Sequence, residues 1–172
     1  GLRGAMAISR ILALLILVGL LAVALPAQDA KNVKGDAGRQ GLWKVWLTRS
    51  YEESTDSTLA PFYRIVTYKD NIESGPFTDY FRSGSLYRKG NLIRVGKLSV
   101  PDGVVEVYRE SGSIEAHESF YRGKRSGPYT KYAISGAITV RGEYDEDRRV
   151  GTWTTFYESG KVKSRGSYVD NY

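Results

Sequence analysis

The sequence predicts an all-β protein: an elongated, single-layer antiparallel sheet of tandem β-hairpin repeats, preceded by an N-terminal signal helix. Gly103, Gly127 and Gly151 open similar stretches at a constant spacing of 24 residues, and a fixed period of this kind is typical of repeat architectures. The 172 residues include 19 glycines and 13 tyrosines, a composition typical of short strands and tight turns. Beyond one apolar N-terminal run, no segment has the pattern of a helix.

The N-terminus contains an apolar run, residues 11–25, that follows Arg10. This run is short for a membrane span, which needs about 20 residues, but it fits the apolar core of a secretory signal peptide. We therefore expect a signal peptide over residues 1–27, in which residues 1–5 are an extension before Met6. The protein is then exported and is periplasmic, outer-envelope-associated or secreted. The alternative is an uncleaved anchor formed by residues 11–25.

The polar residues 28–40 predict a flexible leader, and residues 41–172 predict the repeat domain. Five units are expected, each opening at a glycine, with the boundaries 41–74, 75–102, 103–126, 127–150 and 151–172. The first two units are longer than the others. Their extra residues fall in the polar run 49–58 and in 96–102, and insertions in repeat proteins usually map to loops, often on the working face.

The last four units share a second glycine, nine residues after the first. Each of these glycines follows a serine and comes two residues before an aliphatic side chain; they are Gly84, Gly112, Gly136 and Gly160. Ser-Gly between apolar stretches indicates a hairpin turn, because glycine accepts the positive φ that a tight turn requires. We therefore expect a hairpin tip at each of the four.

Large side chains recur at two positions before each tip. The second residue after the opening glycine is Trp43, Phe77, Val105, Tyr129 or Trp153, and the fifth is Trp46, Tyr80, Tyr108, Tyr132 or Phe156. Positions three apart point to opposite faces of a regular strand. Either both faces of the sheet carry aromatic side chains, or a bulge turns one of the two positions.

After each tip, the aliphatic residue and the residue six positions later are expected on one face. The pairs are Leu86 with Leu92, Ile114 with Phe120, Ile138 with Tyr144, and Val162 with Tyr168. Gly90, Gly142 and Gly166 should lie on that same face and leave room for a large ring from a neighbouring strand. The third unit has Glu118 instead, so there we expect the space to be absent or polar.

These patterns together resemble a known repeat. Gly-x-aromatic-x-x-aromatic, then Ser-Gly-x-aliphatic, then a basic link such as Tyr121-Arg-Gly-Lys-Arg-Ser-Gly127 resembles the MORN-repeat variant, whose proteins are grouped as the YwqK-like antitoxin family. The resemblance covers residues 41–172 and is most specific over 103–168. The consensus histidine of the link is missing here. The resemblance implies hairpins that add to one twisted sheet, and a function in protein binding or scaffolding, with toxin neutralisation in a few members.

No set of residues predicts catalysis, a cofactor or a metal site. His117 is the only histidine, which disfavours histidine-based metal sites and nucleophilic catalysis; a half-exposed strand residue is its simpler interpretation. The acidic run 143–147 matches no calcium loop. Glu52 and Glu53 leave a carbohydrate-active enzyme as an alternative of another class. We expect a non-enzymatic protein without a small-molecule substrate.

The leading hypothesis is a scaffold that binds an unidentified partner protein through an aromatic-rich sheet face, since large exposed apolar patches bind partners. The residues expected there are Trp43, Trp46, Phe77, Tyr80, Tyr108, Tyr129, Tyr132 and Trp153. The alternatives are toxin neutralisation and attachment to an anionic membrane or envelope surface. That attachment would use the basic links between units, which contribute Arg122, Lys124, Arg125, Arg148 and Arg149. The net charge of +6 is modest, so we do not expect nucleic acid as a partner.

Overall fold

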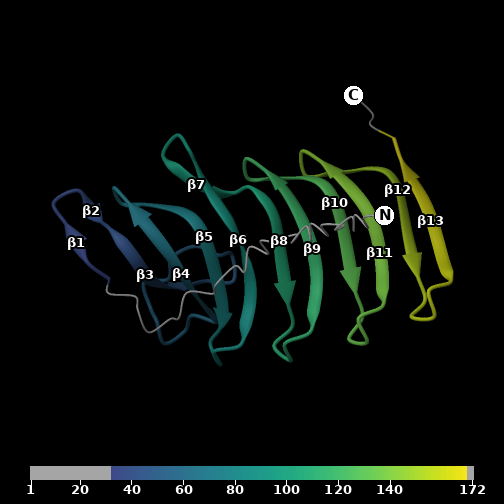
Figure 1. Cartoon of the computed structure of the whole chain (residues 1–172), viewed down its shortest axis with the longest axis horizontal. Helices are drawn as coiled ribbons and strands as arrows, with labels where there is room; N and C mark the ends of the chain where they lie inside the picture. Colours follow the sequence, from purple (N-terminus) through teal and green to yellow (C-terminus); the bar gives the residue numbers. More distant parts are fainter. Residues whose placement is uncertain (1–31, 170–172) are drawn as a thin grey trace, which may run out of the picture.

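The computed structural model describes residues 32–169, and this part of the chain is all β. Figure 1 shows the strands side by side in a single row. Eleven of them form one sheet in the order β13-β12-β11-β10-β9-β8-β6-β5-β4-β3, with β7 paired to β6. All of the pairs are antiparallel, as tandem hairpins require. The expected signal peptide, residues 1–27, lies outside the described residues.

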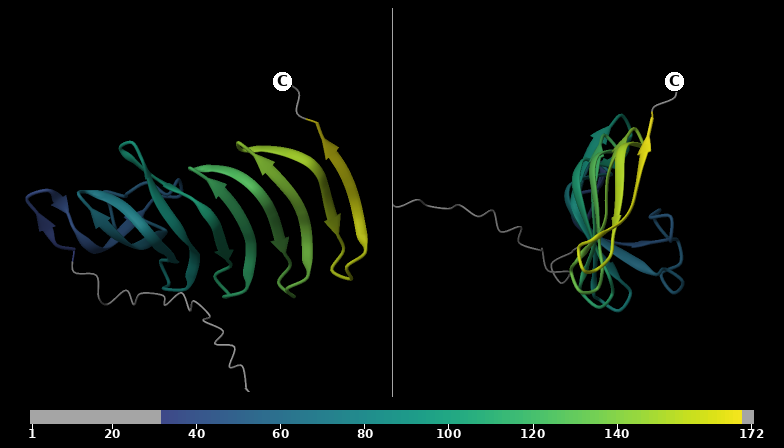
Figure 2. Two further views of the ribbon diagram at one scale, coloured as in Figure 1. Left: turned by 45° about the horizontal axis from the view of Figure 1, so that its top comes forward. Right: turned by 90° about the vertical axis from the view of Figure 1, so that its right-hand side faces the viewer.

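The strands of the sheet are β3 (Gly41–Leu47), β4 (Phe62–Lys69), β5 (Ile72–Phe81), β6 (Leu86–Val95), β7 (Leu98–Pro101), β8 (Gly103–Tyr108), β9 (Ile114–Tyr121), β10 (Lys124–Tyr132), β11 (Ile138–Asp145), β12 (Arg148–Phe156) and β13 (Val162–Tyr168). Figure 2 shows the successive hairpins stacked behind one another as one curved layer. Across residues 32–169, no helix is long and apolar enough to cross a membrane.

A small separate hairpin precedes the sheet and joins β1 (Lys34–Gly35) to β2 (Gly38–Arg39). It lies within residues 28–40, for which the composition predicts a flexible leader. The described part of the segment, residues 32–40, contains this hairpin. Arg39 donates hydrogen bonds of 2.7 and 2.8 Å to the Glu53 carboxylate, and its guanidinium lies 4.8 Å from the ring centroid of Trp43. These contacts attach the hairpin to the first unit.

The four predicted hairpin tips share one geometry. In each, the glycine amide donates a hydrogen bond of 2.8–3.0 Å to the carbonyl three residues earlier. The tip glycines have φ between +83° and +95°, a region that L-residues with side chains rarely adopt. The prediction of a tip at Gly84, Gly112, Gly136 and Gly160 is therefore confirmed.

A β-bulge recurs three residues after each tip glycine. The pairing skips one residue in each of the last four units; the skipped residues are Tyr87, Glu115, Thr139 and Lys163. Such a bulge reverses the alternation of faces along the strand. Leu86 thus pairs with Tyr80 on one face, whereas Leu92 lies on the other face, with Phe77. The expectation that Leu86 and Leu92 share a face, and likewise the three equivalent pairs, is wrong.

The register also places the two aromatic columns on opposite faces. We call face A the side that carries the second position of each unit, Trp43, Phe77, Val105, Tyr129 and Trp153. Face B carries the fifth position, Trp46, Tyr80, Tyr108, Tyr132 and Phe156. The main core cluster lies on face A of the first three units and comprises Val45, Leu47, Val66, Tyr68, Phe77, Leu92 and Val105.

Candidate binding site

Rings pack on glycines along face A. A Cβ added at Gly142 would lie 2.2 Å from the ring of Trp153, and one added at Gly90 would lie 3.0 Å from that of Phe77. Tyr129 stacks on Trp153 with ring centroids 5.5 Å apart. The prediction that these glycines leave room for a ring is confirmed at Gly90 and Gly142, because only glycine permits such close approach.

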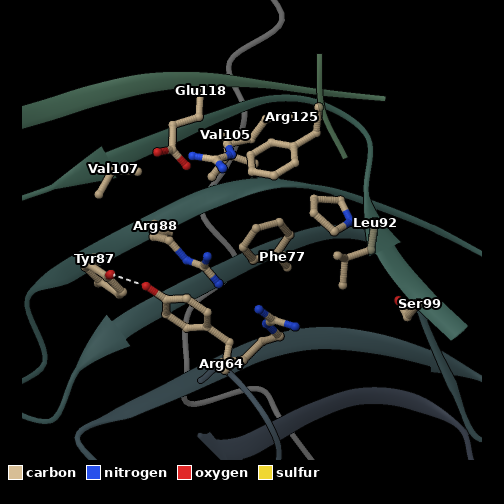
Figure 3. Close-up of a pocket in the computed structure, with 13 residues that line it drawn as sticks. Arg64, Phe77, Tyr87, Arg88, Leu92, Ser99, Val105, Val107, Glu118 and Arg125 are labelled. Atoms are coloured by element: carbon tan, nitrogen blue, oxygen red, sulfur yellow. Dashed lines mark hydrogen bonds between the residues drawn. The ribbon is translucent and has the colours of Figure 1, made fainter. Parts of the chain in front are cut away.

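The ring column is interrupted in the third unit. Val105 stands where the other units have a ring, and Glu118 stands opposite it, where they have glycine. Val105 is only 1% exposed. Because valine is smaller than the rings of the other units, it does not occupy the space that a ring would fill. The missing ring leaves a hollow of about 520 Å³ on face A (Figure 3). The space at Glu118 is therefore present and polar.

Both insertions of the early units reach this hollow. Tyr51 comes from the loop between β3 and β4, and Ser99 and Pro101 come from β7. The Tyr51 hydroxyl lies 2.6 Å from that of Tyr87, and the Ser99 hydroxyl donates to the carbonyl of Glu73 at 2.8 Å. The prediction of a loop at residues 49–58 is confirmed, whereas the second insertion contains a short strand.

A row of charged residues borders one side of the hollow. Arg64, Asp79 and Arg88 are direct cross-strand partners on β4, β5 and β6. The carboxylate of Asp79 is fully buried and accepts hydrogen bonds from Arg64 at 2.7 and 3.0 Å and from Arg88 at 2.7 and 3.1 Å. Glu73 accepts a further bond of 2.8 Å from Arg64. Burial alone would lower the pKa of Arg64, but these two carboxylates outweigh it and raise that pKa.

Two of the arginines that line the hollow, Arg88 and Arg125, also lie against aromatic rings. Arg88 lies 3.7 Å from the ring centroid of Tyr51. Arg125 lies 4.3 Å from that of Tyr144 and forms an ion pair with Asp147 at 3.2 Å. Cation–π contacts of this kind hold a guanidinium in place. The arginines are therefore positioned as part of the wall.

Glu118 differs from the other charged residues of the hollow. It is half-buried, and its carboxylate receives no hydrogen bond from any residue between 32 and 169. Burial raises the pKa of Glu118, and the positive charges of Arg125 and Arg88 act in the opposite direction. The three arginines of the hollow are each paired with an acid, namely Asp79, Glu73 or Asp147. The hollow therefore combines an apolar floor with one carboxylate that has no direct partner.

The eight aromatic residues predicted to bind a partner do not form one surface. Face A carries Trp43, Phe77, Tyr129 and Trp153, and face B carries Trp46, Tyr80, Tyr108 and Tyr132. The opening strands have no bulge between the two positions, so a spacing of three separates them. Phe77 and Trp153 are 3% and 6% exposed, and their rings hold neighbouring strands together. Of the eight residues, Phe77 lines the hollow.

The rings of face B form two local groups. Tyr63 stacks on Tyr80 at 5.0 Å and meets Trp46 edge-on at 5.5 Å. Further along the sheet, the ring Nδ1 of His117 lies 3.0 Å from the hydroxyl of Tyr132. His117 is thus a partly buried strand residue with a ring partner.

The basic residues of the links lie in or directly beside the turns that lead into β10 and β12. Acidic residues of the next link neutralise part of the charge of the first link. Lys124 pairs with Glu146 at 3.1 Å and Arg125 with Asp147 at 3.2 Å. These pairs are exposed, and such pairs contribute little to stability. They nevertheless reduce the positive potential that an anionic surface would meet.

The remaining link residues are placed differently. Arg122 has φ of +49°, and its amide donates to the Asp102 carboxylate at 2.8 Å. Arg149 lies 4.3 Å from the ring centroid of Trp153. Arg148 is exposed at the start of β12. The five predicted residues are therefore not gathered into one patch of free cations.

The acidic residues weighed in the sequence have other partners. The Glu53 carboxylate accepts hydrogen bonds from both terminal nitrogens of Arg39. Glu52 and Glu53 therefore do not form a pair of free carboxylates. Among residues 32–169, no group of three or more histidine or acidic side chains is placed to hold a metal ion.

Aromatic periodicity in the sequence does not predict the charged row of Arg64, Asp79 and Arg88, nor the role of Glu118. The available signal lies in the exceptions to the pattern. Arg64 and Asp79 interrupt otherwise apolar positions of face A, and Glu118 stands at a glycine position. Charges at core-facing positions of a strand require partners, so they indicate a buried ion network or a site.

Comparison with known families identifies one of the hairpins. Residues 149–170 match the MORN repeat variant. The chain contains a MORN repeat. The match spans β12, the tip at Gly160 and β13, so the unit of the family coincides with one hairpin of the structure. No curated protein and no solved structure matches the chain.

Proposed function

We propose that the protein is an exported, non-enzymatic MORN-repeat scaffold that binds a partner protein at the hollow on face A. The MORN repeat supports a repeat scaffold or binding protein. The observation that carries the site is that four departures from the regular unit border one hollow. They are the two insertions, with Tyr51 and Ser99, and the two exchanges of the third unit, Val105 and Glu118. Departures from a repeat that meet in one place favour a binding role for that place.

The hollow suits a lysine or arginine side chain of the partner, next to an apolar residue. Phe77, Val105 and Phe120 offer the alkyl stem an apolar floor. Glu118 offers the charged group a carboxylate, whereas the arginines of the wall already have acidic partners. Hydrogen bonds between charged groups in a partly desolvated site are the stronger kind and give specificity.

A double variant tests this site by rebuilding the regular unit. Val105→Trp would place a ring beside Gly90, and Glu118→Gly would restore a glycine opposite Tyr129. We expect the variant to fold, because both exchanges copy neighbouring units, and to lose the hollow. The probe is a library of random peptides displayed on phage, selected against the full chain in mild detergent. The natural chain should enrich peptides with a basic residue beside an apolar one, and the variant should not.

The matched control changes face B. Tyr108→Ser with Tyr132→Ser removes two rings on the far side of the sheet and should leave the peptide selection unchanged. If the face-B variant lost the enrichment and the rebuilt unit kept it, the hollow would not be the binding site. Glu118→Gln adds a finer test, since it should abolish the preference for basic residues and leave the apolar preference intact.

Export is supported by the apolar run 11–25 and by the small residues after it. The test is N-terminal sequencing of the protein recovered from each cell fraction. A product that begins at residue 28 in an exported fraction is the expected result, and a product that begins at Met6 would contradict cleavage.

Attachment to an anionic surface is the second candidate, since the basic links lie at one end of successive hairpins. Co-sedimentation with anionic vesicles should then fall steeply between 50 and 500 mM salt, roughly as charge screening requires. Absent or salt-independent binding would remove this candidate. Toxin neutralisation is a narrower form of partner binding, in which a toxin supplies the basic segment. Loss of toxicity on co-expression with a toxin encoded beside this chain would support it, and unchanged toxicity would oppose it.

A further inference from the structure

The two edges of the sheet differ in how their backbone is covered. At one edge, the amide of Lys44 in β3 donates to the side chain of Asn32 at 2.8 Å, and the carbonyl of Trp46 accepts a bond of 2.8 Å from Ser54. At the other edge, β13 pairs only with β12 within residues 32–169. Every residue from 161 to 169 is exposed. An uncovered edge strand is a template for pairing with another strand.

β13 also contains a glycine that no ring covers. Gly166 holds the position in the last unit that Gly142 holds in the unit before. Trp153 covers Gly142, but nothing lies within 4 Å of a Cβ added at Gly166. Beside it, Tyr168 meets Trp153 edge-on at 6.2 Å and remains 43% exposed. The edge therefore has the glycine and the flanking rings of the contact, and lacks the covering ring.

We propose that β13 pairs antiparallel with β13 of a second copy of this chain, about a two-fold axis at Ser167. In this register Gly166 lies opposite the partner's Tyr168, and Tyr168 lies opposite the partner's Gly166. Each Tyr168 then covers a glycine on the adjacent strand, as Trp153 covers Gly142. Two-fold pairing of one edge with itself closes into a dimer and does not propagate.

Charge disfavours two of the neighbouring registers, and the axis at Ser167 is preferred to one at Gly166 because it sets Tyr168 opposite the glycine. An axis at Arg165 would place two guanidinium groups opposite each other, and an axis at Ser164 would place Lys163 opposite Arg165. Like charges in direct opposition destabilise a strand pair. With the axis at Ser167, the two Arg165 residues lie four positions apart, roughly 14 Å along the strands. This separation exceeds the screening length of about 8 Å at physiological salt.

Absence of cysteine from the chain allows a direct test by cross-linking. Ser167→Cys places a thiol on the proposed axis, where opposed residues have Cα atoms roughly 4.5–5.5 Å apart, within the range for a disulfide. Ser164→Cys is the matched control on the same exposed strand. Its symmetry mate would lie roughly 20 Å away along the strands. The full chain in mild detergent is treated with a mild oxidant, and the dimer is followed on non-reducing gels.

We expect the Ser167→Cys chain to cross-link at least tenfold faster than the Ser164→Cys chain. Gly166→Val, added to Ser167→Cys, should reduce that rate at least tenfold, because the valine fills the space for the partner's Tyr168. The monomer should keep its fold, since the site is open and has no left-handed φ, and β-branched residues favour strands. A thermal melt verifies this. Equal rates at the two cysteines, no effect of Gly166→Val, or a product that contains another protein would each overturn the proposal.

Discussion

The indole ring of Trp153 lies directly on Gly142, so that a Cβ at Gly142 would come within 2.2 Å of the ring. This contact joins the fourth unit to the fifth. Gly142→Ala should therefore displace the ring and reduce the free energy of unfolding by about 1–3 kcal/mol. The measurement is urea unfolding followed by tryptophan fluorescence. Gly166→Ala is the matched control and should change the stability by no more than about 0.5 kcal/mol; equal losses in the two variants would contradict this account.

Asp79→Asn should be among the most destabilising single exchanges. It removes the buried negative charge that Arg64 and Arg88 share, and loss of one partner in a buried ion pair costs about 3–5 kcal/mol. Chemical denaturation at neutral pH measures the loss. Asp36→Asn, an exposed aspartate before β2, is the control and should stay within about 0.5 kcal/mol of the natural chain. A loss at Asp79 no larger than the control would show that the network contributes little.

Glu118→Gln should stabilise the protein at neutral pH. Burial raises the folded-state pKa of Glu118 above its ordinary value of 4.5, so the folded state binds this proton more tightly than the unfolded state does. The natural chain should therefore lose stability as the pH rises from 4.5 through the raised pKa, and the glutamine variant should not. Thermal melts between pH 4 and pH 8 should show equal stability at the acidic end and a growing advantage of the variant above it.

Glu52→Gln is the control for this pH series. Glu52 is exposed in the loop between β3 and β4, and its exchange should leave the pH dependence unchanged. If Glu118→Gln were less stable than the natural chain at neutral pH, the carboxylate would have a partner within the fold, and its proposed role toward a basic segment would be lost.

The hairpins and their tips could be predicted from the sequence because the determinants are local. A glycine with positive φ at a fixed interval specifies each tip without reference to the rest of the chain. The faces could not be assigned after the tips, because the bulge that exchanges them has no mark of its own. The residues that form it, Tyr87, Glu115, Thr139 and Lys163, share no chemistry.

The hollow could be anticipated only in part. The glutamate at a glycine position predicts a polar space in the third unit, and that space is present. Its walls depend on contacts between distant residues, such as the one between Tyr51 and Tyr87, which are 36 positions apart. A loop of polar residues carries no periodicity that would reveal where it folds back.

The main core cluster lies on the first three units, so resistance to opening should decline toward the C-terminal end. Amide hydrogen exchange followed by mass spectrometry should find β4 and β5 the slowest to exchange and β13 the fastest, with intermediate rates between them. Uniform rates along the row would mean that the hairpins open together. If opening is graded, the hairpin of β12 and β13 opens most readily. Pairing of β13 with a second chain would then stabilise this hairpin against opening, and the stabilisation would increase with protein concentration.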